Sequence, residues 1–242
     1  MIDYYSPSAE FYDMVAVRHT ASSGPPLARI LAGTATGHGP VLEIGAGTGR
    51  VTEVIAAALP DAEILAAEPS ATMRAQLMAR IARDPGLRRR VTVTDGAAQD
   101  MELPGRLSAV VIFGVAGHLD SAERTALWRR LADRLPAGGP IIVELMGVAA
   151  PRRIPPEMSL RETIGQQTYE WWIGGEPAGG DAMHFTTTWR VLRDGRTVRE
   201  VEDSYRWHTF GVDQLARESG MAARRVAEAG GAAIPEIGVL VR

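Results

Sequence analysis

Apolar and polar positions divide the chain into two kinds of segment. Short apolar runs of strand length alternate with longer segments whose apolar residues recur at helical spacing, and glycine, proline and serine separate them. The pattern predicts strands at Val41–Ile44, Glu63–Ala67, Val91–Thr94, Ala109–Phe113 and Pro140–Leu145. It predicts helices around Ser8–Val15, Pro26–Ala35, Arg50–Leu59, Ala71–Arg83 and Ala122–Leu135. Alternation of strands and helices with short loops is typical of a doubly wound α/β fold with a mostly parallel sheet.

The pattern changes after Gly147, where Pro151, Pro155 and Pro156 mark a connection. Residues 182–208 alternate between apolar and polar on both sides of Asp194-Gly195. Asp-Gly between two alternating runs predicts a β-hairpin. A helix at Val212–Ser219 and a last strand at Ile237–Val241 follow. The second half therefore predicts an antiparallel β-rich insertion after the fifth strand of the sheet.

A glycine-rich loop, VLEIGAGTGR, follows the first predicted strand. A dinucleotide-binding loop requires a third glycine at the position that Arg50 occupies here, whereas this loop has Gly45, Gly47 and Gly49. Glu43 stands two residues before the first of these glycines, where an acid disfavours a pyrophosphate and can pair with a cationic ligand. A plain strand–turn–helix connection built on flexible glycines remains an alternative for the loop taken alone.

Two further loops follow the second and third strands. Glu68-Pro69-Ser70 ends the second strand, about twenty residues after the glycine loop, with Met73 one turn into the next helix. An acid at this place can accept hydrogen bonds from both ribose hydroxyls of a nucleoside, in NAD enzymes as in others. The third strand leads into residues 97–101, AAQDM, a loop suited to lining an adenine.

Together these motifs resemble a known family. E-I-G-A-G-T-G, E-P-S-x-x-M, G-A-A-Q-D-M and L-P-A-G-G-P-I-I-V-E resemble the class I S-adenosylmethionine-dependent methyltransferases, over about Val41 to Glu144. AEFYDMVAVR, FGVAGHLD and IGVLVR resemble, more weakly, the small-molecule N-methyltransferases that act on amino sugars of bacterial natural products. The resemblance implies a Rossmann-like class I methyltransferase fold and S-adenosyl-L-methionine as the cofactor.

The resemblance also implies cofactor-binding residues. Glu43, Gly45, Gly47 and Gly49 would line the methionine moiety, Glu68 would bind the ribose, Met73 or Pro69 would pack on the adenine, and Phe113 would lie beside the methyl group. Ala97 and Ala98 stand where the family often has an aspartate and a small residue. Because Ala97 cannot bind the adenine amino group, main-chain groups, Gln99 or Asp95 are left for that contact.

His118 and Tyr12 are the candidate catalytic residues. His118 follows the carboxyl end of a parallel strand, where ligands bind in such sheets, and its G-H-L context resembles the amino-sugar family. It is a base, a substrate orienter or a cofactor contact, or else it caps the helix that starts near Ser121. Tyr12 fits a family tyrosine that an N-terminal helix brings near the sulfonium. Tyr4, Tyr5 and Phe11 are weaker candidates, and core packing is favoured for Phe11.

The candidate substrate residues lie in the β-rich segment. Tyr169 and Trp171 share one face of a strand and could form an aromatic wall for a flat or cationic substrate, with Trp172 on the other face. His184 could face either the substrate or solvent. Trp128, Trp189 and Trp207 are expected in the core. The remaining predictions are that His19 and His38 lie in solvent and that Arg88–Arg90 form a solvated turn.

Composition excludes several chemistries. The 242 residues contain no cysteine, lysine or asparagine. Thiol nucleophiles, Schiff-base chemistry, the cysteine-dependent and Asn-Pro-Pro-Tyr types of nucleic-acid methylation, and the Asp/Asp/Asn metal set of catechol-type enzymes are therefore excluded. We predict no metal site, and the net charge of −3 favours neither nucleic acid nor an anionic membrane. With no apolar segment of spanning length, the chain is expected to be cytoplasmic.

The sequence thus predicts methyl transfer to a small-molecule acceptor, in bacterial specialised metabolism, with the acceptor atom (N, O or C) left open. A methyltransferase-fold protein that binds the cofactor without methylating, as a cyclase or binding module, is the alternative. We expect one domain with an N-terminal helical lid (1–38), a cofactor-binding sheet core (39–147), a β-rich substrate lid (148–210) and a closing helix and antiparallel strand (211–242). An exposed hairpin could mediate a homodimer.

Overall fold

The computed structural model describes residues 6–145, 147–226 and 236–242. Its core is a seven-stranded sheet, sheet A, in the order β10-β11-β5-β4-β1-β2-β3. The sheet A strands are β1 (Val41–Ile44), β2 (Ile64–Ala67), β3 (Val91–Thr94), β4 (Ala109–Ile112), β5 (Pro140–Leu145), β10 (Ala222–Arg225) and β11 (Glu236–Val241). The first five run parallel, whereas β11 is antiparallel to both β5 and β10. The predicted doubly wound, mostly parallel sheet is confirmed.

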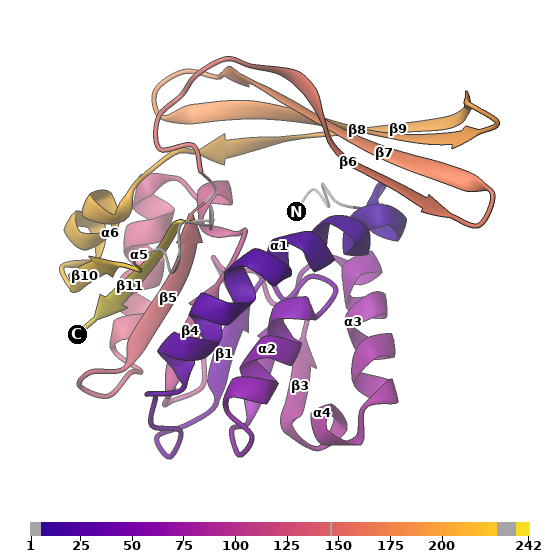
Figure 1. Cartoon of the computed structure of the whole chain (residues 1–242). Coiled ribbons are helices and arrows are strands. Elements are labelled where there is room, and N and C mark those ends of the chain that lie inside the picture. Colours follow the sequence, from indigo (N-terminus) through magenta and orange to yellow (C-terminus); the bar gives the residue numbers. More distant parts are fainter. Residues whose placement is uncertain (1–5, 146, 227–235) are drawn as a thin grey trace.

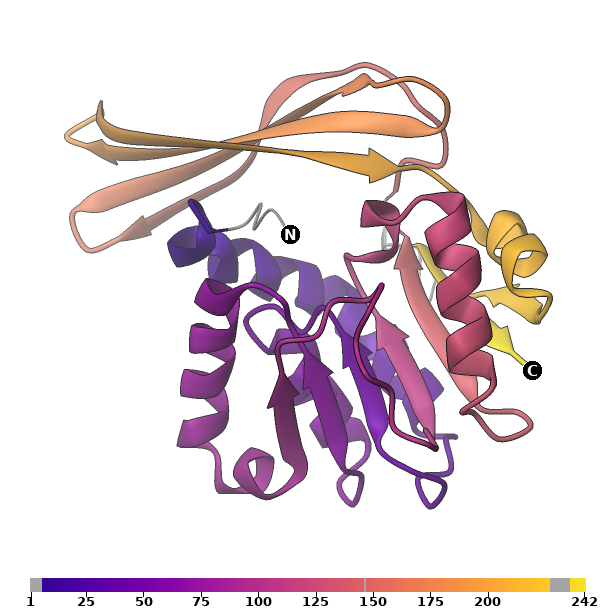
Figure 2. The same cartoon turned by 180° about the vertical axis from the view of Figure 1, so that it is seen from behind.

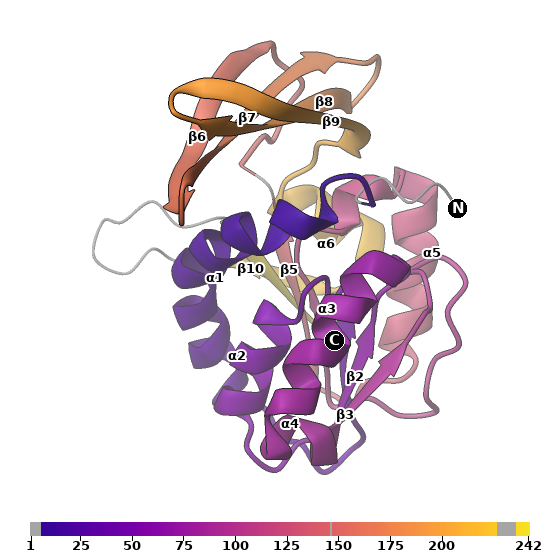
Figure 3. The same ribbon diagram turned by 90° about the vertical axis from the view of Figure 1, so that its right-hand side faces the viewer.

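Helices cover both faces of sheet A, as the strand residues require (Figure 3). Because all residues of β1, β4 and β5 are buried, their apolar side chains face a helical layer on each side. One layer consists of α1 (Ala9–Leu31), α2 (Arg50–Ala58), α3 (Ala71–Arg83) and the short α4 (Pro85–Arg90). The other consists of α5 (Ser121–Ala132) and α6 (Val212–Ser219), and the one-turn helix η1 (Ala116–His118) precedes α5.

The N-terminal region differs from the prediction of two helices. One continuous helix, α1, includes Pro25 and Pro26. The run TASSGPP indicates a break, but the helix continues through it and packs closely on α2, where a Cβ on Gly24 would lie 3.3 Å from Val54 Cγ2. Because α1 continues past Val15, where the first predicted helix ended, Tyr12 and His19 fall on one face of the same helix. Figure 1 shows α1 running from sheet B along the core.

A second, antiparallel sheet follows β5. Sheet B has the order β6-β7-β8-β9, with β6 at Ile154–Ile164, β7 at Gln167–Pro177, β8 at Ala182–Arg193 and β9 at Arg196–His208. The predicted hairpin is β8–β9, and Asp194 (φ 51°) and Gly195 (φ 75°) both take the left-handed conformation that such a tight turn requires. The hairpin β6–β7 was not predicted, because β6 includes the prolines that mark a connection in the sequence.

Sheet B lies across the carboxyl ends of the parallel strands and extends beyond the core (Figures 1 and 2). It rests on two supports. The ring of Phe11 in α1 stacks on Trp189, with ring centroids 5.1 Å apart. At the other end, Trp207 packs against η1 so closely that a Cβ on Gly117 would lie 2.0 Å from the indole. Trp128, Trp189 and Trp207 are all buried, as predicted.

Two smaller corrections concern arginines and sheet edges. Arg88–Arg90 form the end of helix α4 and not a turn, although Arg88 and Arg89 are exposed as expected. Arg90 donates to the carbonyl oxygens of Ala56, Leu59 and Ala62, so it ties α4 to the end of α2. The edge strand β10 was not predicted either.

No helix among residues 6–145, 147–226 and 236–242 is long and apolar enough to span a membrane.

Candidate active site

Two cavities open at the carboxyl edge of sheet A. The first, here called the strand-end cavity, has a volume of about 570 Å³ and is lined by the loops that follow β1, β2, β3 and β4. The second, here called the lid cavity, has a volume of about 420 Å³ and lies between α1, the end of β5 and the inner face of sheet B. Tyr12 and Gly114 line both cavities, so the two spaces meet at these residues.

The glycine loop forms one wall of the strand-end cavity. Gly45, Gly47 and Gly49 all have positive φ angles, of 76°, 55° and 89°. Gly45 and Gly47 line the cavity, and a Cβ on Gly45 would lie 2.1 Å from Val115 Cγ2. Gly49 does not line it. Gly49 is the N-cap of α2, packed so that a Cβ would lie 2.7 Å from Leu77 Cδ1, and its role is to seat the helix.

Glu68 lies in the strand-end cavity as predicted, with only 6% of its surface exposed. Its Oε2 accepts from the amide of Gly47 and its Oε1 from the amide of Ser70, both at 2.8 Å. These bonds fix the carboxylate in one orientation between two loops. Each carboxylate oxygen can accept more than one hydrogen bond, so the arrangement leaves capacity for ligand hydroxyls.

Glu43 is not on the cavity wall, contrary to the prediction. It faces α2 from the middle of β1, is 2% exposed, and its Oε2 accepts from Thr52 Oγ1 at 2.6 Å. Within the described part of the chain, its Oε1 has no hydrogen-bond partner. Burial raises the pKa of Glu43 to about 8, and the nearby Glu68 raises it as well. Strand alternation explains the position, since Glu43 must share a face with the core residue Val41.

The residues predicted to surround the nucleoside come together around the strand-end cavity. Pro69, Met73, Ala97, Ala98 and Phe113 all line it. Asp95 and Gln99, the two candidates for the adenine amino group, line it as well. The sequence analysis missed Arg130 of α5, which fixes this loop by donating to the carbonyl oxygens of Ala98, Gln99 and Met101.

His118 lines the strand-end cavity and not the lid cavity. Its ring packs against Tyr205 and Trp207, with centroids 5.5 and 5.0 Å away. Burial lowers the pKa of His118 to about 4, so the imidazole is neutral at physiological pH. Asp120 caps α5 through a capping box with Glu123, and the helix-cap alternative for His118 is therefore wrong.

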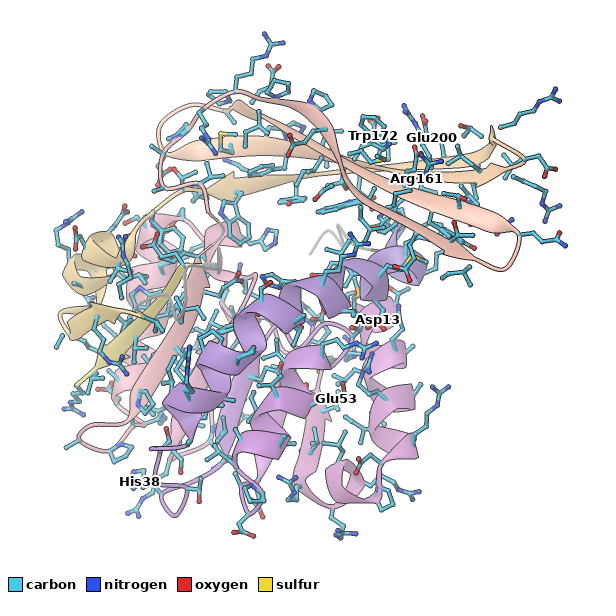
Figure 4. The ribbon with its side chains drawn as sticks, in the orientation of Figure 1. Asp13, His38, Glu53, Arg161, Trp172 and Glu200 are labelled. Carbon is cyan, nitrogen blue, oxygen red and sulfur yellow. The ribbon has the colours of Figure 1, made fainter. Side chains whose placement is uncertain are left out.

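Tyr12 lies at the junction of the two cavities because an ion-pair cluster anchors its helix. The neighbouring Asp13 accepts from Thr48 Oγ1 (2.8 Å), Arg50 Nε (3.0 Å) and Arg80 Nη2 (2.8 Å). Figure 4 shows Asp13 near Glu53, which also pairs with Arg80, where α1, α2 and α3 meet. Burial raises the pKa of Tyr12 to about 12, and Glu68 and Glu144 raise it further, so its phenol stays protonated. Tyr4 and Tyr5 lie outside the described residues.

The inner face of sheet B supplies the aromatic wall of the lid cavity. Trp171 lines the cavity with Trp189, Leu160 and Tyr205. Tyr169 is on the same face but packs against Phe11, with centroids 5.9 Å apart, and does not line the cavity. Trp172, Arg161 and Glu200 project from the outer side of the sheet (Figure 4).

His184 is exposed and is also absent from the lid cavity wall. It pairs with Glu176 and Arg206 across sheet B, whereas its neighbours Met183 and Phe185 are buried. His184 therefore lies on the outer face of β8, and the structure gives it no place in the cavity.

The sequence analysis missed a pair of polar residues at the base of the lid cavity. His19 Nε2 lies 2.5 Å from Glu144 Oε1, and both residues line the cavity. The prediction that His19 lies in solvent holds only in part: 36% of its side chain is exposed, but its ring is held against a carboxylate that is only 1% exposed. His38, by contrast, lies at the far end of the core (Figure 4). The other polar residues of the lining are Ser8, Arg18, Ser159, Thr187 and Asp203.

The fold and the paired cavities define the class of protein. Residues 42–141 match the model of a methyltransferase domain, and the predicted resemblance to class I S-adenosylmethionine-dependent methyltransferases is confirmed. No group of three or more metal-binding side chains occurs within the described ranges.

Solved structures extend the likeness to the whole chain. DesVI from Streptomyces venezuelae is 19% identical, with 100% of this chain and 99% of that chain covered and a TM-score of 0.73. CalS10, an S-adenosylmethionine-bound amino pentose methyltransferase from Micromonospora echinaspora involved in calicheamicin biosynthesis, is 18% identical, with 96% of each chain covered and the same TM-score. The glycopeptide N-methyltransferase MtfA, complexed with S-adenosyl-L-homocysteine, is 28% identical over 88% of this chain and 84% of that chain, with a TM-score of 0.59. No curated protein sequence matches the chain.

Proposed function

We propose that this protein transfers a methyl group from S-adenosyl-L-methionine to a nitrogen atom of a small-molecule acceptor. The observation that carries the proposal is the meeting of two cavities at Tyr12 and Gly114. Transfer requires acceptor, methyl group and sulfur in line, and two cavities with one shared boundary provide this arrangement. Alignment of this kind supplies roughly 7–11 kcal/mol of the barrier reduction.

The strand-end cavity fits the cofactor. Glu68 accepts hydrogen bonds from the ribose hydroxyls, because its carboxylate is already oriented by Gly47 and Ser70. Gly45 and Gly47 give the methionine portion close access to the main chain, and the loop at Ala97–Gln99 surrounds the adenine. The cofactor supplies an electrophilic methyl group on a positively charged sulfur.

The residues at the junction orient the reactants and exclude water. Tyr12 keeps its proton at physiological pH, so it donates a hydrogen bond or offers its ring face to positive charge, and it does not act as a base. His118 is neutral and forms part of the cofactor wall, where its packing on Tyr205 and Trp207 joins sheet B to the core. We assign it a positioning role.

The lid cavity favours an amine acceptor. Its walls combine the aromatic faces of Trp171, Trp189 and Tyr205 with the carboxylates of Glu144 and Asp203. Aromatic faces and carboxylates both attract an ammonium group. The methylation of an amino pentose by CalS10 and the N-methylation by MtfA support nitrogen as the acceptor atom and specialised metabolism as the setting.

A labelled-cofactor assay tests the proposal. The protein is incubated with S-adenosylmethionine carrying a labelled methyl group and a panel of amino sugars, free and nucleotide-linked, and glycopeptide amines. Matched compounds with a hydroxyl in place of the amine serve as controls. Label in the amines alone supports the proposal. Cofactor that binds but leaves every amine unlabelled contradicts it and favours a cofactor-binding module.

A further inference from the structure

The His19–Glu144 pair joins α1 to the end of β5 across 125 residues of sequence. Glu144 makes a second contact, since its Oε2 accepts from the amide of Gly114 at 3.1 Å. Gly114 lines both cavities. The carboxylate therefore connects the boundary of the two cavities, on one side, to an imidazole in the acceptor cavity, on the other.

We propose that His19 and Glu144 form a proton-accepting pair for the acceptor amine, an inference that rests on the proposed function. An amine in water is mostly an ammonium ion, which has no lone pair with which to attack carbon. A carboxylate-bound imidazole within the same cavity can take the excess proton. Because 36% of the His19 side chain is exposed, the proton can then leave to solvent without crossing the cofactor cavity.

The step balances without a further reactant. The ammonium R–NH₃⁺ transfers one proton to the neutral imidazole of His19, which becomes an imidazolium ion paired with Glu144. The free lone pair on nitrogen forms the N–CH₃ bond as the S–CH₃ bond breaks, and the sulfur keeps the bonding electrons. The product is R–NH₂–CH₃⁺ with S-adenosylhomocysteine, and His19 releases its proton to water.

The other ionisable groups around the lid cavity are less suited to this role. Tyr12 of α1 and Tyr205 of β9 both have raised pKa values, chiefly because they are buried, and keep their protons. Arg18 of α1 points toward the Arg161 carbonyl of β6, at 3.5 Å, and cannot accept a proton.

Two other ionisable groups remain to be compared with His19. Asp203 of β9 lines the cavity, and we assign its carboxylate to attraction of the acceptor's positive charge. His118 is separated from this cavity, and burial lowers its pKa to about 4, so it is a weak base. The hydrogen bond with Glu144 instead raises the pKa of His19, which strengthens it as a proton acceptor.

Sinefungin provides a test that does not depend on turnover. This cofactor analogue carries an amino group in place of the methylsulfonium, so its ammonium lies at the cavity boundary. S-adenosylhomocysteine, which has no charge there, is the matched control. Calorimetry measures both affinities from pH 5.5 to 8.5 for the native chain, for His19→Gln and Glu144→Gln, and for the distant control His38→Gln.

We expect the preference for sinefungin over S-adenosylhomocysteine to rise about tenfold with pH in the native chain and in His38→Gln, because the pair becomes negative when His19 loses its proton. In His19→Gln the preference is independent of pH. In Glu144→Gln it is lower at every pH, and its midpoint moves to lower pH. NMR of histidine labelled at Cε1, assigned with His19→Gln, should show the same shift in midpoint for His19.

The outcomes separate the inference from the proposed function. A preference that does not change with pH in the native chain, or that changes equally in His19→Gln, overturns the proton-accepting pair while leaving cofactor binding intact. Failure of S-adenosylhomocysteine to bind at any pH contradicts the proposed function and the inference together. Affinity for S-adenosylhomocysteine in each variant also reports whether it has folded.

Discussion

The strand-end cavity and the lid cavity are built in different ways. Except for Tyr12, the strand-end cavity is lined by residues between Ile44 and Leu119, which belong to the loops after four neighbouring strands and include the carboxylates of Glu68 and Asp95. The lid cavity collects residues from α1, from the end of β5 and from all four strands of sheet B, as far apart as Ser8 and Tyr205. One cavity depends on local turns, and the other on the docking of two distant sheets.

This difference in construction matches two different tasks: the strand-end cavity binds a cofactor that is the same in all such enzymes, and the lid cavity selects an acceptor that varies between them. Main-chain contacts tolerate change in the surrounding side chains, so the loops of sheet A can hold one cofactor in many sequences. Side chains on a docked sheet can be exchanged singly without disturbing the strands beneath them. Four substitutions test this division, and the two cavities should respond independently except where sheet B meets η1.

Glu68→Ala should have the largest effect and should affect the strand-end cavity alone. The substitution removes an acceptor for two ribose hydroxyls, and hydrogen bonds to a charged group contribute about 1.5–3 kcal/mol each. We expect affinity for S-adenosylhomocysteine, measured by calorimetry, to fall at least about 100-fold. Glu63→Ala, at the exposed amino end of the same strand, is the control. Equal affinity in the Glu68 variant would remove the ribose assignment.

Glu43→Gln tests the buried acid that lies behind the strand-end cavity. The pKa of Glu43 is raised from 4.5 to about 8 in the folded chain, so its contribution to stability is fully present below pH 4.5 and is lost as pH rises through 8. The native chain should therefore lose about 3 kcal/mol relative to Glu43→Gln between pH 5 and pH 7.5.

Denaturant unfolding at the two pH values measures this difference, with Glu63→Gln as the control. An equal loss of stability in the native chain and in Glu43→Gln would mean that Glu43 is already ionised in the folded state.

Gly117→Ala should disturb both cavities together. The new Cβ would lie 2.0 Å from the Trp207 indole, and overpacking of this kind costs about 1–3 kcal/mol. We expect a loss of about 2 kcal/mol in unfolding free energy, with weaker cofactor binding and slower transfer. Gly105→Ala, in a loop where a Cβ has no neighbour within 4 Å and the φ angle is not positive, should change stability by less than about 1 kcal/mol. Loss of methyl transfer without loss of cofactor affinity would show that the contact between η1 and sheet B affects only the lid cavity.

Trp171→Ala should have the smallest effect and should affect the lid cavity alone. Loss of an aromatic wall removes roughly 1.4 kcal/mol of acceptor binding, which corresponds to about a tenfold fall in kcat/KM with the amine that the panel identifies. Trp172→Ala is a matched control, because that indole faces outward, where it donates to Glu170. Similar losses in both variants would show that the effect comes from sheet stability.

The same contrast explains what could be predicted from sequence. Gly45, Gly47, Glu68 and Met73 stand at fixed offsets from strands that periodicity identifies, so a linear motif locates them. Each of these residues lies within a few positions of a strand end, so most of the strand-end cavity can be predicted from the sequence. Glu43 was misplaced because the motif indicates proximity to a ligand, whereas strand alternation turns its side chain toward α2.

Most of the lid cavity could not be predicted in this way, although some signals were present. Glu144 is the penultimate residue of the buried strand β5, as Glu43 is of β1, and a helix extended past Val15 puts His19 on the face of Tyr12. The expected break before Pro26 concealed that face. Alternation from the buried Trp189 places His184 on the opposite side of β8. How sheet B docks, by contrast, depends on contacts between Trp207 and Gly117, ninety residues apart.

The even number of strands in sheet B has an evolutionary consequence. Ile154 pairs with Gly175, which pairs with Phe185, which pairs with Tyr205, so the chain enters and leaves the sheet at the same end. Exchange of the whole meander for another one would therefore need only two joins in the chain, near Leu145 and Thr209. New acceptor ranges can therefore arise by transplantation as well as by gradual point mutation.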